Sequence, residues 1–79
     1  MKGEAVKKET LRPGHQPVYS SLFRSAGFVD GHLELTYHNG KTYRYSVARD
    51  VFDALVGAKS PGQYYHEHVR KLGIKGVEV

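Results

Sequence analysis

The chain has 79 residues, a formal net charge of +4 and no cysteine. This length allows one small domain, and the lack of cysteine excludes disulfides and thiolate metal sites. No apolar run is long enough to span a membrane or to form a secretory signal, so we expect a cytoplasmic protein without a membrane partner.

Residues 1–17 carry few apolar side chains and show no hydrophobic period. Such a segment cannot bury enough surface to offset the entropy lost when it orders. We therefore predict a flexible N-terminal arm at 1–17, a folded domain at 18–73 and a short tail at 74–79. The tail is either an additional edge strand or a loose end.

Three strand patterns follow one another in the first half of the domain. The first covers about residues 19–29, with a bulge expected at Gly27. Asp30-Gly31 marks the turn into a second strand at 32–38, and Asn39-Gly40 marks the turn into a third at 41–47. Short turns between consecutive strands indicate an antiparallel meander.

Two helix patterns occupy the second half of the domain. The first, at about residues 49–58, gathers its apolar side chains on one side. The second has a complete start signal, because Ser60 is a good N-cap, Pro61 suits the first helical position and Gln63 completes a capping box.

The apolar face of the second helix is predicted to use Tyr65, Val69 and Leu72, and Gly73 is predicted to end it. The predicted fold class is α+β. It consists of a three-stranded antiparallel β-meander followed by two α-helices packed on one face.

Two registers compete at the turn that joins the second and third strands. A two-residue loop pairs Leu35 with Arg44 and turns Tyr43 and Tyr45 to the polar face. A three-residue loop with Gly40 in a left-handed bulge shifts the pairing by one residue. The pairs then become Leu33–Tyr45, Glu34–Arg44, Leu35–Tyr43 and Thr36–Thr42.

The energies favour the shifted register. Each of its cross-strand pairs contributes roughly 0.2–1 kcal/mol, and each large apolar side chain that it buries adds roughly 1.5–3 kcal/mol. The opposing turn preference is comparable to other local backbone preferences, at about 1 kcal/mol. We therefore predict that Tyr43 and Tyr45 line the core, and that Arg44 lies beside Glu34 on the open face.

A series of short motifs runs through the folded part in a fixed order. They are Ser20-Ser21, Gly27-Phe28, Leu33-x-Leu35-x-Tyr37, Gly40, Tyr43-x-Tyr45, Val47 and Ala58-x-Ser60-x-Gly62-x-Tyr64-Tyr65. In this order they resemble the KTSC domain, a short domain found at the C-terminus of some lysyl-tRNA synthetases and alone in bacterial and phage proteins. The resemblance covers about residues 18–72. The sequence departs from the family pattern at Ala48, where proline is usual, and at His66, where asparagine is usual.

Catalytic and metal-binding patterns are weak in this chain. His66 and His68 are two residues apart on a helix and therefore point about 200° apart. His32 and His38 share a strand face but lie roughly 20 Å apart at about 3.3 Å per residue. No local motif supplies a nucleophile with its base. We expect no enzymatic activity, no cofactor and no bound metal.

Basic and aromatic residues on and around the second helix predict a nucleic-acid surface, because cations bind phosphates and rings stack on bases. The candidates are Lys41, Lys59, Tyr64, His66, His68, Arg70 and Lys71. They predict a small accessory module that binds single-stranded nucleic acid, RNA above all, without strong sequence specificity. The synthetase context of the resembled family implies RNA by analogy.

Two other interpretations explain the same residues. One is an ordinary solvated helix face with a single ring packed on the sheet. The other is a protein-interaction module, such as a phage or bacterial regulator that binds a host protein through a sheet edge or its helices.

Overall fold

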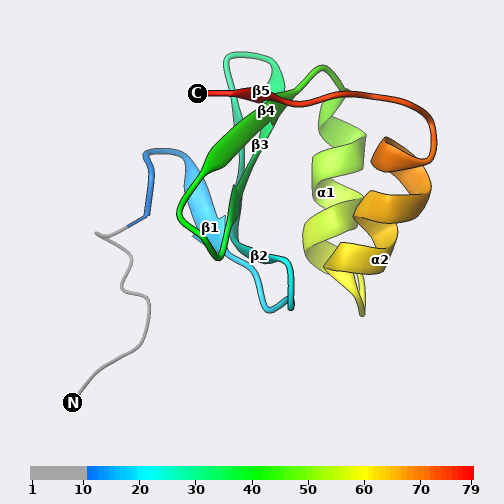
Figure 1. Ribbon diagram of the computed structural model, residues 1–79, viewed down its shortest axis with the longest axis horizontal. Coiled ribbons are helices and arrows are strands. Elements are labelled where there is room, and N and C mark those ends of the chain that lie inside the picture. The colour runs from blue at the N-terminus through cyan, green and yellow to red at the C-terminus, as the bar shows by residue number, and fades with distance from the viewer. Residues whose placement is uncertain (1–10) are drawn as a thin grey trace.

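The computed structural model describes residues 11–79 as an antiparallel sheet with helices on one face (Figure 1). The strands are β1 (His15–Pro17), β2 (Phe23–Val29), β3 (His32–Tyr37), β4 (Thr42–Tyr45) and β5 (Val77–Glu78). The helices are α1 (Arg49–Gly57), α2 (Pro61–Tyr65) and a π-helical segment, η2 (His66–Arg70), which continues α2. The greater part of the predicted arm, residues 1–10, lies outside the described residues.

Residues 11–79 form a sheet of five strands in the order β1-β2-β3-β4-β5, and each strand runs antiparallel to the next. The α+β class is confirmed, but the prediction of three strands is wrong. β1 comes from the end of the segment predicted to be an arm, and β5 comes from the tail, which forms an edge strand. The sequence did not predict β1, because His15-Gln16-Pro17 has no alternating apolar pattern.

Gly27 does not form the predicted bulge. It pairs regularly with Glu34, and the register shift in β2 lies between Phe23 and Ser25. A Cβ on Gly27 would lie only 2.6 Å from Cδ2 of His15. Glycine is therefore required here because the imidazole ring of β1 crosses over the backbone of β2.

The pairing of β3 with β4 is the register that the sequence energies favour, with Leu33 opposite Tyr45 and Leu35 opposite Tyr43. Gly40 adopts a φ of 90°, in the left-handed region that the three-residue loop requires. Tyr45 is only 3% exposed and belongs to the core, as predicted. Tyr43 packs against the core but remains half-buried, so its predicted burial is only partial.

Both helices begin where the sequence predicts. α1 starts at Arg49 without a side-chain cap and buries Phe52 and Leu55. α2 starts at Pro61, and the Oγ of Ser60 accepts a hydrogen bond from the backbone N–H of Gln63 at 3.3 Å. None of the helices formed by residues 11–79 is long and apolar enough to cross a membrane.

The helical segment widens after α2. The N–H of Lys71 donates to the carbonyl of His66 over 2.8 Å, five residues back, which is the π-helical pattern. The wider turn keeps Val69 fully buried but leaves Leu72 68% exposed. The predicted apolar face is therefore wrong at Leu72, whereas Gly73 ends the segment with a φ of 80°, as expected.

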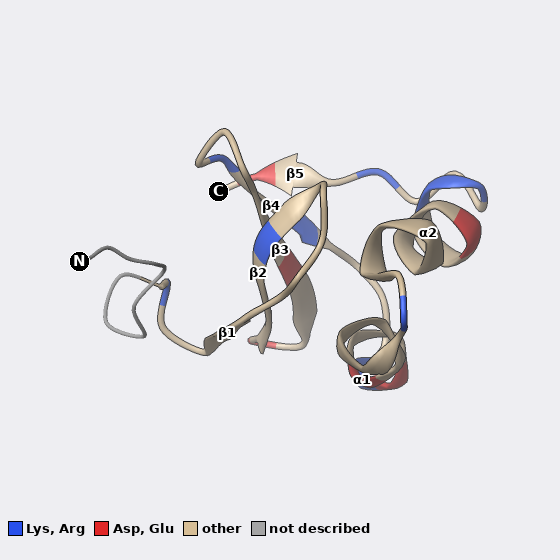
Figure 2. Ribbon diagram, turned by 90° about the horizontal axis from the view of Figure 1, so that it is seen from below, with Lys and Arg blue, Asp and Glu red and all other residues tan. Residues whose placement is uncertain are grey.

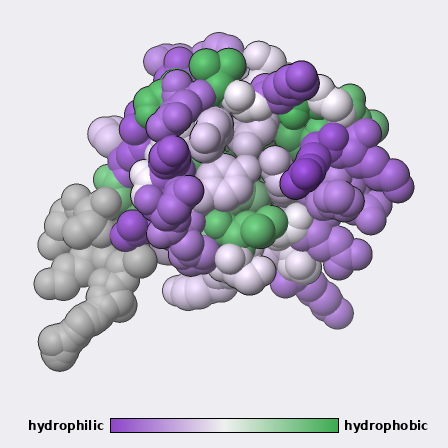
Figure 3. Space-filling view, viewed as in Figure 1, coloured by the Kyte–Doolittle hydropathy of each residue, from purple (hydrophilic) through white to green (hydrophobic). Residues whose placement is uncertain are grey.

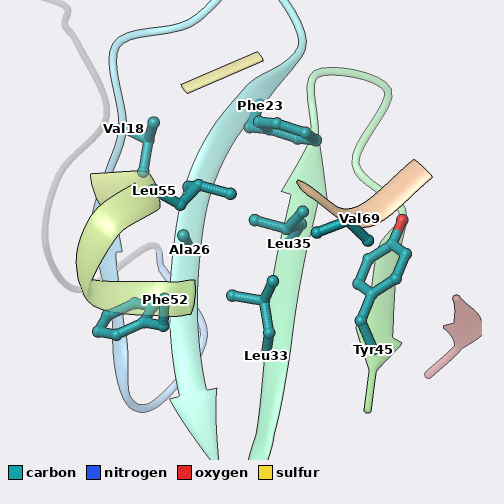
Figure 4. Close-up of a cluster of buried hydrophobic side chains, with 9 residues drawn as sticks. All are labelled: Val18, Phe23, Ala26, Leu33, Leu35, Tyr45, Phe52, Leu55 and Val69. Carbon is teal, nitrogen blue, oxygen red and sulfur yellow. The ribbon is translucent and has the colours of Figure 1, made fainter. Parts of the chain in front are cut away.

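The hydrophobic core lies between the sheet and the helices. Figure 4 shows side chains from β2, β3, α1 and η2 pointing toward one another, with Leu35 near the middle of the group. Phe23, Leu33, Leu55 and Val69 are fully buried with it. In Figure 3, pale and hydrophobic side chains reach the surface between the sheet and the helices, and hydrophilic side chains flank them.

Candidate functional site

Three groups of polar and aromatic side chains are candidates for a function. The first is an open hollow of about 270 Å³ where α1 leads into α2. Its lining consists of Ala58, Lys59, Ser60, Gln63, Tyr64, Glu67 and His68, and we call it the helix-start hollow.

Stacked rings dominate the helix-start hollow. Tyr64 and His68 lie one helical turn apart, with 4.2 Å between ring centroids and 21° between ring planes. Lys59 brings a cation to the same hollow, and Glu67 brings an opposing carboxylate. The hollow therefore combines flat ring surface with one charge of each sign.

The second group is an open hollow of about 360 Å³ on the helical face of the sheet, beside β4. Its lining consists of Tyr37, Asn39, Tyr43, Tyr45 and Gly76, and we call it the tyrosine hollow. Sequence reasoning assigned Tyr43 and Tyr45 to the scaffold and missed the hollow that they help to form.

Neutral phenols line the tyrosine hollow. The hydroxyls of Tyr37 and Tyr45 share a hydrogen bond of 2.7 Å. Burial raises the pKa of Tyr37 to about 12, and burial together with hydrogen bonding to Tyr37 and Tyr65 raises the pKa of Tyr45. These phenols therefore stay protonated at neutral pH and can donate hydrogen bonds.

The third group, the glutamate cluster, lies on the sheet face away from the helices. It consists of Arg12, His15, Ser25, Glu34 and Arg44. The Glu34 carboxylate is 2% exposed and accepts hydrogen bonds from Arg44 Nη2 at 2.7 Å and from His15 Nε2 at 2.9 Å. Nε of Arg12 lies 3.6 Å from the same carboxylate. This face is thus closed at Glu34, not open as predicted.

Burial alone would raise the pKa of Glu34. The hydrogen bonds from His15 and Arg44, together with the positive charge of Arg12, outweigh burial and lower that pKa below its ordinary value. Glu34 is therefore held as a carboxylate that ties β1, β3 and β4 together.

The glutamate cluster contains the residue types of a hydrolytic triad, since Nδ1 of His15 also lies 2.9 Å from Oγ of Ser25. Ser25 is only 1% exposed, however, so a substrate cannot reach its hydroxyl. We infer a structural role for this set. Among residues 11–79, no group of three or more histidine, aspartate or glutamate side chains is placed to hold a metal ion.

A comparison with protein-family models matches the KTSC domain over residues 19–72. The chain belongs to the KTSC domain family. A comparison with curated proteins gives no match.

The matched span of the KTSC domain includes both hollows except for Gly76. It also includes Glu34 and Arg44, whereas Arg12 and His15 precede it. The glutamate cluster therefore joins the KTSC domain to a strand that the family match does not cover.

The KTSC domain brings together only part of the predicted nucleic-acid surface. Lys59, Tyr64 and His68 line the helix-start hollow. The stacking of Tyr64 on His68 places these two rings on the same side of the helical segment.

The remaining candidates lie elsewhere on the KTSC domain. His66 and Arg70 are exposed on η2, and Lys71 is exposed just beyond it. Figure 2 shows cationic segments both at the link between α1 and α2 and after the second helix. Lys41 is exposed in the β3–β4 turn, which lies well away from α2 in Figures 1 and 2.

Proposed function

We propose that this KTSC domain is a small accessory module that binds single-stranded nucleic acid, RNA above all, without strong sequence readout. The supporting observation is the stacked pair of Tyr64 and His68 in an open hollow beside Lys59. Unpaired bases stack on such rings, and each stacked base contributes about 1–3 kcal/mol. A duplex hides the faces of its bases, so a single strand is the expected ligand.

The distribution of charge supports the same proposal. The chain carries a net charge of +4, and beyond the helix-start hollow Arg70 ends the same helical segment and Lys71 follows it. The segment Pro61–Arg70 spans roughly 15 Å at about 1.5 Å per residue. A bound strand would meet Lys59 at one end of this segment and Arg70 with Lys71 at the other. Glu67 lies in the hollow between them and disfavours a phosphate at its own position.

Fluorescence anisotropy of the full chain with a labelled single-stranded RNA of mixed sequence tests the proposal. We expect log affinity to fall linearly with log salt, and Lys59→Gln to reduce the slope by about 0.7, the value for one phosphate contact on a single strand. Arg49→Gln is the matched control, because it removes an exposed cation from the other helix. Undetectable binding at low salt, or equal effects of the two variants, would refute the proposal.

Glu67→Gln gives a test of opposite sign within the same hollow. Removing the only carboxylate among the lining residues should strengthen RNA binding, whereas Lys59→Gln weakens it. A Glu67→Gln variant that binds more weakly would contradict a phosphate path beside the rings.

A protein-interaction module is the second candidate. β5 is a two-residue edge strand, and its Val77 and the adjacent Val79 are 67% and 45% exposed. A partner strand added at this edge would gain backbone hydrogen bonds and apolar contact. Recovery of one stoichiometric protein from nuclease-treated lysate, abolished by Val77→Lys, would establish this function instead.

A further inference from the structure

The tyrosine hollow has the lining of a site for a flat aromatic ring. Three tyrosines, one carboxamide and one glycine surround about 360 Å³, and no charged side chain belongs to this lining. The hollow lies apart from the helix-start hollow and shares no lining residue with it.

The walls of the tyrosine hollow are fixed by packing. Tyr37 and Tyr43 meet edge to face, with 5.6 Å between centroids and 88° between planes. A Cβ on Gly76 would lie 2.7 Å from the Tyr45 ring, so the backbone before β5 lies directly against that ring. Tyr43 is half-buried, which leaves part of its ring accessible to a ligand.

Hydrogen-bond donors are oriented around the hollow. Oδ1 of Asn39 accepts the backbone N–H of Lys41 at 2.9 Å, which fixes the carboxamide. Within residues 11–79, neither the amide NH₂ of Asn39 nor the hydroxyl of Tyr43 has a hydrogen-bond partner. An aliphatic ligand would displace the water around these donors and offer them no partner, whereas a ring with acceptor atoms on its edge would satisfy them.

Nucleobases have the required chemistry, because each base is flat and carries oxygen or nitrogen acceptors on its edge. We propose that the tyrosine hollow binds one nucleobase of a single-stranded chain. The base stacks on Tyr43 and accepts a hydrogen bond from the amide of Asn39. Lys41, exposed in the same turn, meets the attached phosphate. The identity of the ring as a nucleobase rests on the proposed function, but the presence of a ring-binding site does not.

One acidic residue stands close to this site. Glu78 faces Tyr43 across the β4–β5 pair, and antiparallel partners point to the same side of the sheet. Its carboxylate disfavours a phosphate beside β5 and accepts a hydrogen bond from an amino group of a base. The phosphate is therefore directed to the side of Lys41.

Titration of the isotope-labelled full chain with uridine or adenosine 5′-monophosphate, followed by NMR, tests the inference. We expect saturable shifts of the backbone amides of Asn39, Tyr43 and Gly76. Ribose 5-phosphate is the control without a base, and it should leave these amides unshifted. Equal shifts with the control, or no shifts at high nucleotide concentration, would overturn the inference.

Two variants separate ligand binding from folding. Tyr43→Leu removes the ring but keeps apolar contact with the core, and it should weaken nucleotide binding at least about fivefold, the lower end of a stacking contribution. Asn39→Asp keeps the oxygen that accepts the Lys41 N–H and removes the amide donor, so it should also weaken binding. Unchanged affinity in both folded variants would overturn the inference.

Failure of this inference differs from failure of the proposed function. Nucleotide shifts confined to Tyr64 and His68 would overturn the base site in the tyrosine hollow and leave the proposed function intact. Shifts at Asn39, Tyr43 and Gly76 would establish the base site. If RNA affinity were also unchanged after replacement of Tyr64 and His68, the observation that supports the proposed function would be removed.

Discussion

Replacing Glu34 with glutamine tests whether the buried glutamate cluster holds β1 on the sheet. Glutamine preserves the volume but removes the charge that accepts hydrogen bonds from Arg44 and from the fully buried His15 ring. Loss of one partner from a buried ion pair costs about 3–5 kcal/mol. Both arginines are partly exposed and regain water, so we expect the free energy of unfolding to fall by roughly 2–3 kcal/mol.

Urea unfolding followed by circular dichroism measures this loss. The matched control is Asp53→Asn, which makes the same chemical change in an exposed ion pair with Arg49 at 3.7 Å. Exposed pairs of this kind contribute about 0.2–1 kcal/mol. A Glu34→Gln variant no less stable than Asp53→Asn would refute the view that the cluster anchors β1.

The pH dependence of stability gives a second test of Glu34. Its pKa is lowered by folding from an ordinary value of 4.5, so the unfolded chain takes up the proton first as the pH falls. The stabilisation by Glu34 is therefore fully present above pH 4.5 and is lost as the pH falls through the folded pKa. The stability difference between the wild type and Glu34→Gln should shrink in this acid range, and a constant difference would contradict the lowered pKa.

Three further predictions concern packing and titration. Gly27→Ala should lower the free energy of unfolding by about 1–3 kcal/mol in urea melts, because of overpacking, whereas Gly57→Ala, with open space around it, should be neutral or stabilising. Leu55→Ala should cost about 2–5 kcal/mol, while alanine at the exposed Leu72 should change stability by less than about 0.5 kcal/mol. Tyr37→Phe should remove an ionisation near pH 12 from the ultraviolet titration. The free energy of unfolding of the wild type should fall as the pH rises above 10, because folding raises the pKa of Tyr37.

The features that sequence analysis predicts well depend on neighbouring residues. The β3–β4 register follows from residue pairs on either side of a single turn. The burial energy and the turn preference that compete there can therefore be weighed from the sequence alone. The start of α2 likewise depends on two local signals, Ser60 and Pro61. At the start of α2 the burial of apolar side chains and the backbone preferences favour the same structure.

The features that sequence analysis missed depend on distant contacts. His15 is buried only because Glu34 accepts its N–H and Gly27 leaves space for its ring, and both lie on other strands. The π-helical turn that exposes Leu72 has no local signature, since it depends on backbone hydrogen bonds that span five residues, such as the one from the Lys71 N–H to the His66 carbonyl. The tyrosine hollow needs Gly76, which reaches Tyr45 only after the chain returns to the sheet as β5.

The most direct test of the proposed function compares a single-stranded RNA with the duplex formed from it and its complement, at one salt concentration. We expect the full chain to prefer the single strand at least about fivefold, the contribution of one stacked base. The double variant Tyr64→Ala, His68→Ala should lose this preference while it keeps the cations that bind duplex phosphates. Equal affinity of the wild type for both forms, or an unchanged preference in the double variant, would contradict binding through the stacked rings.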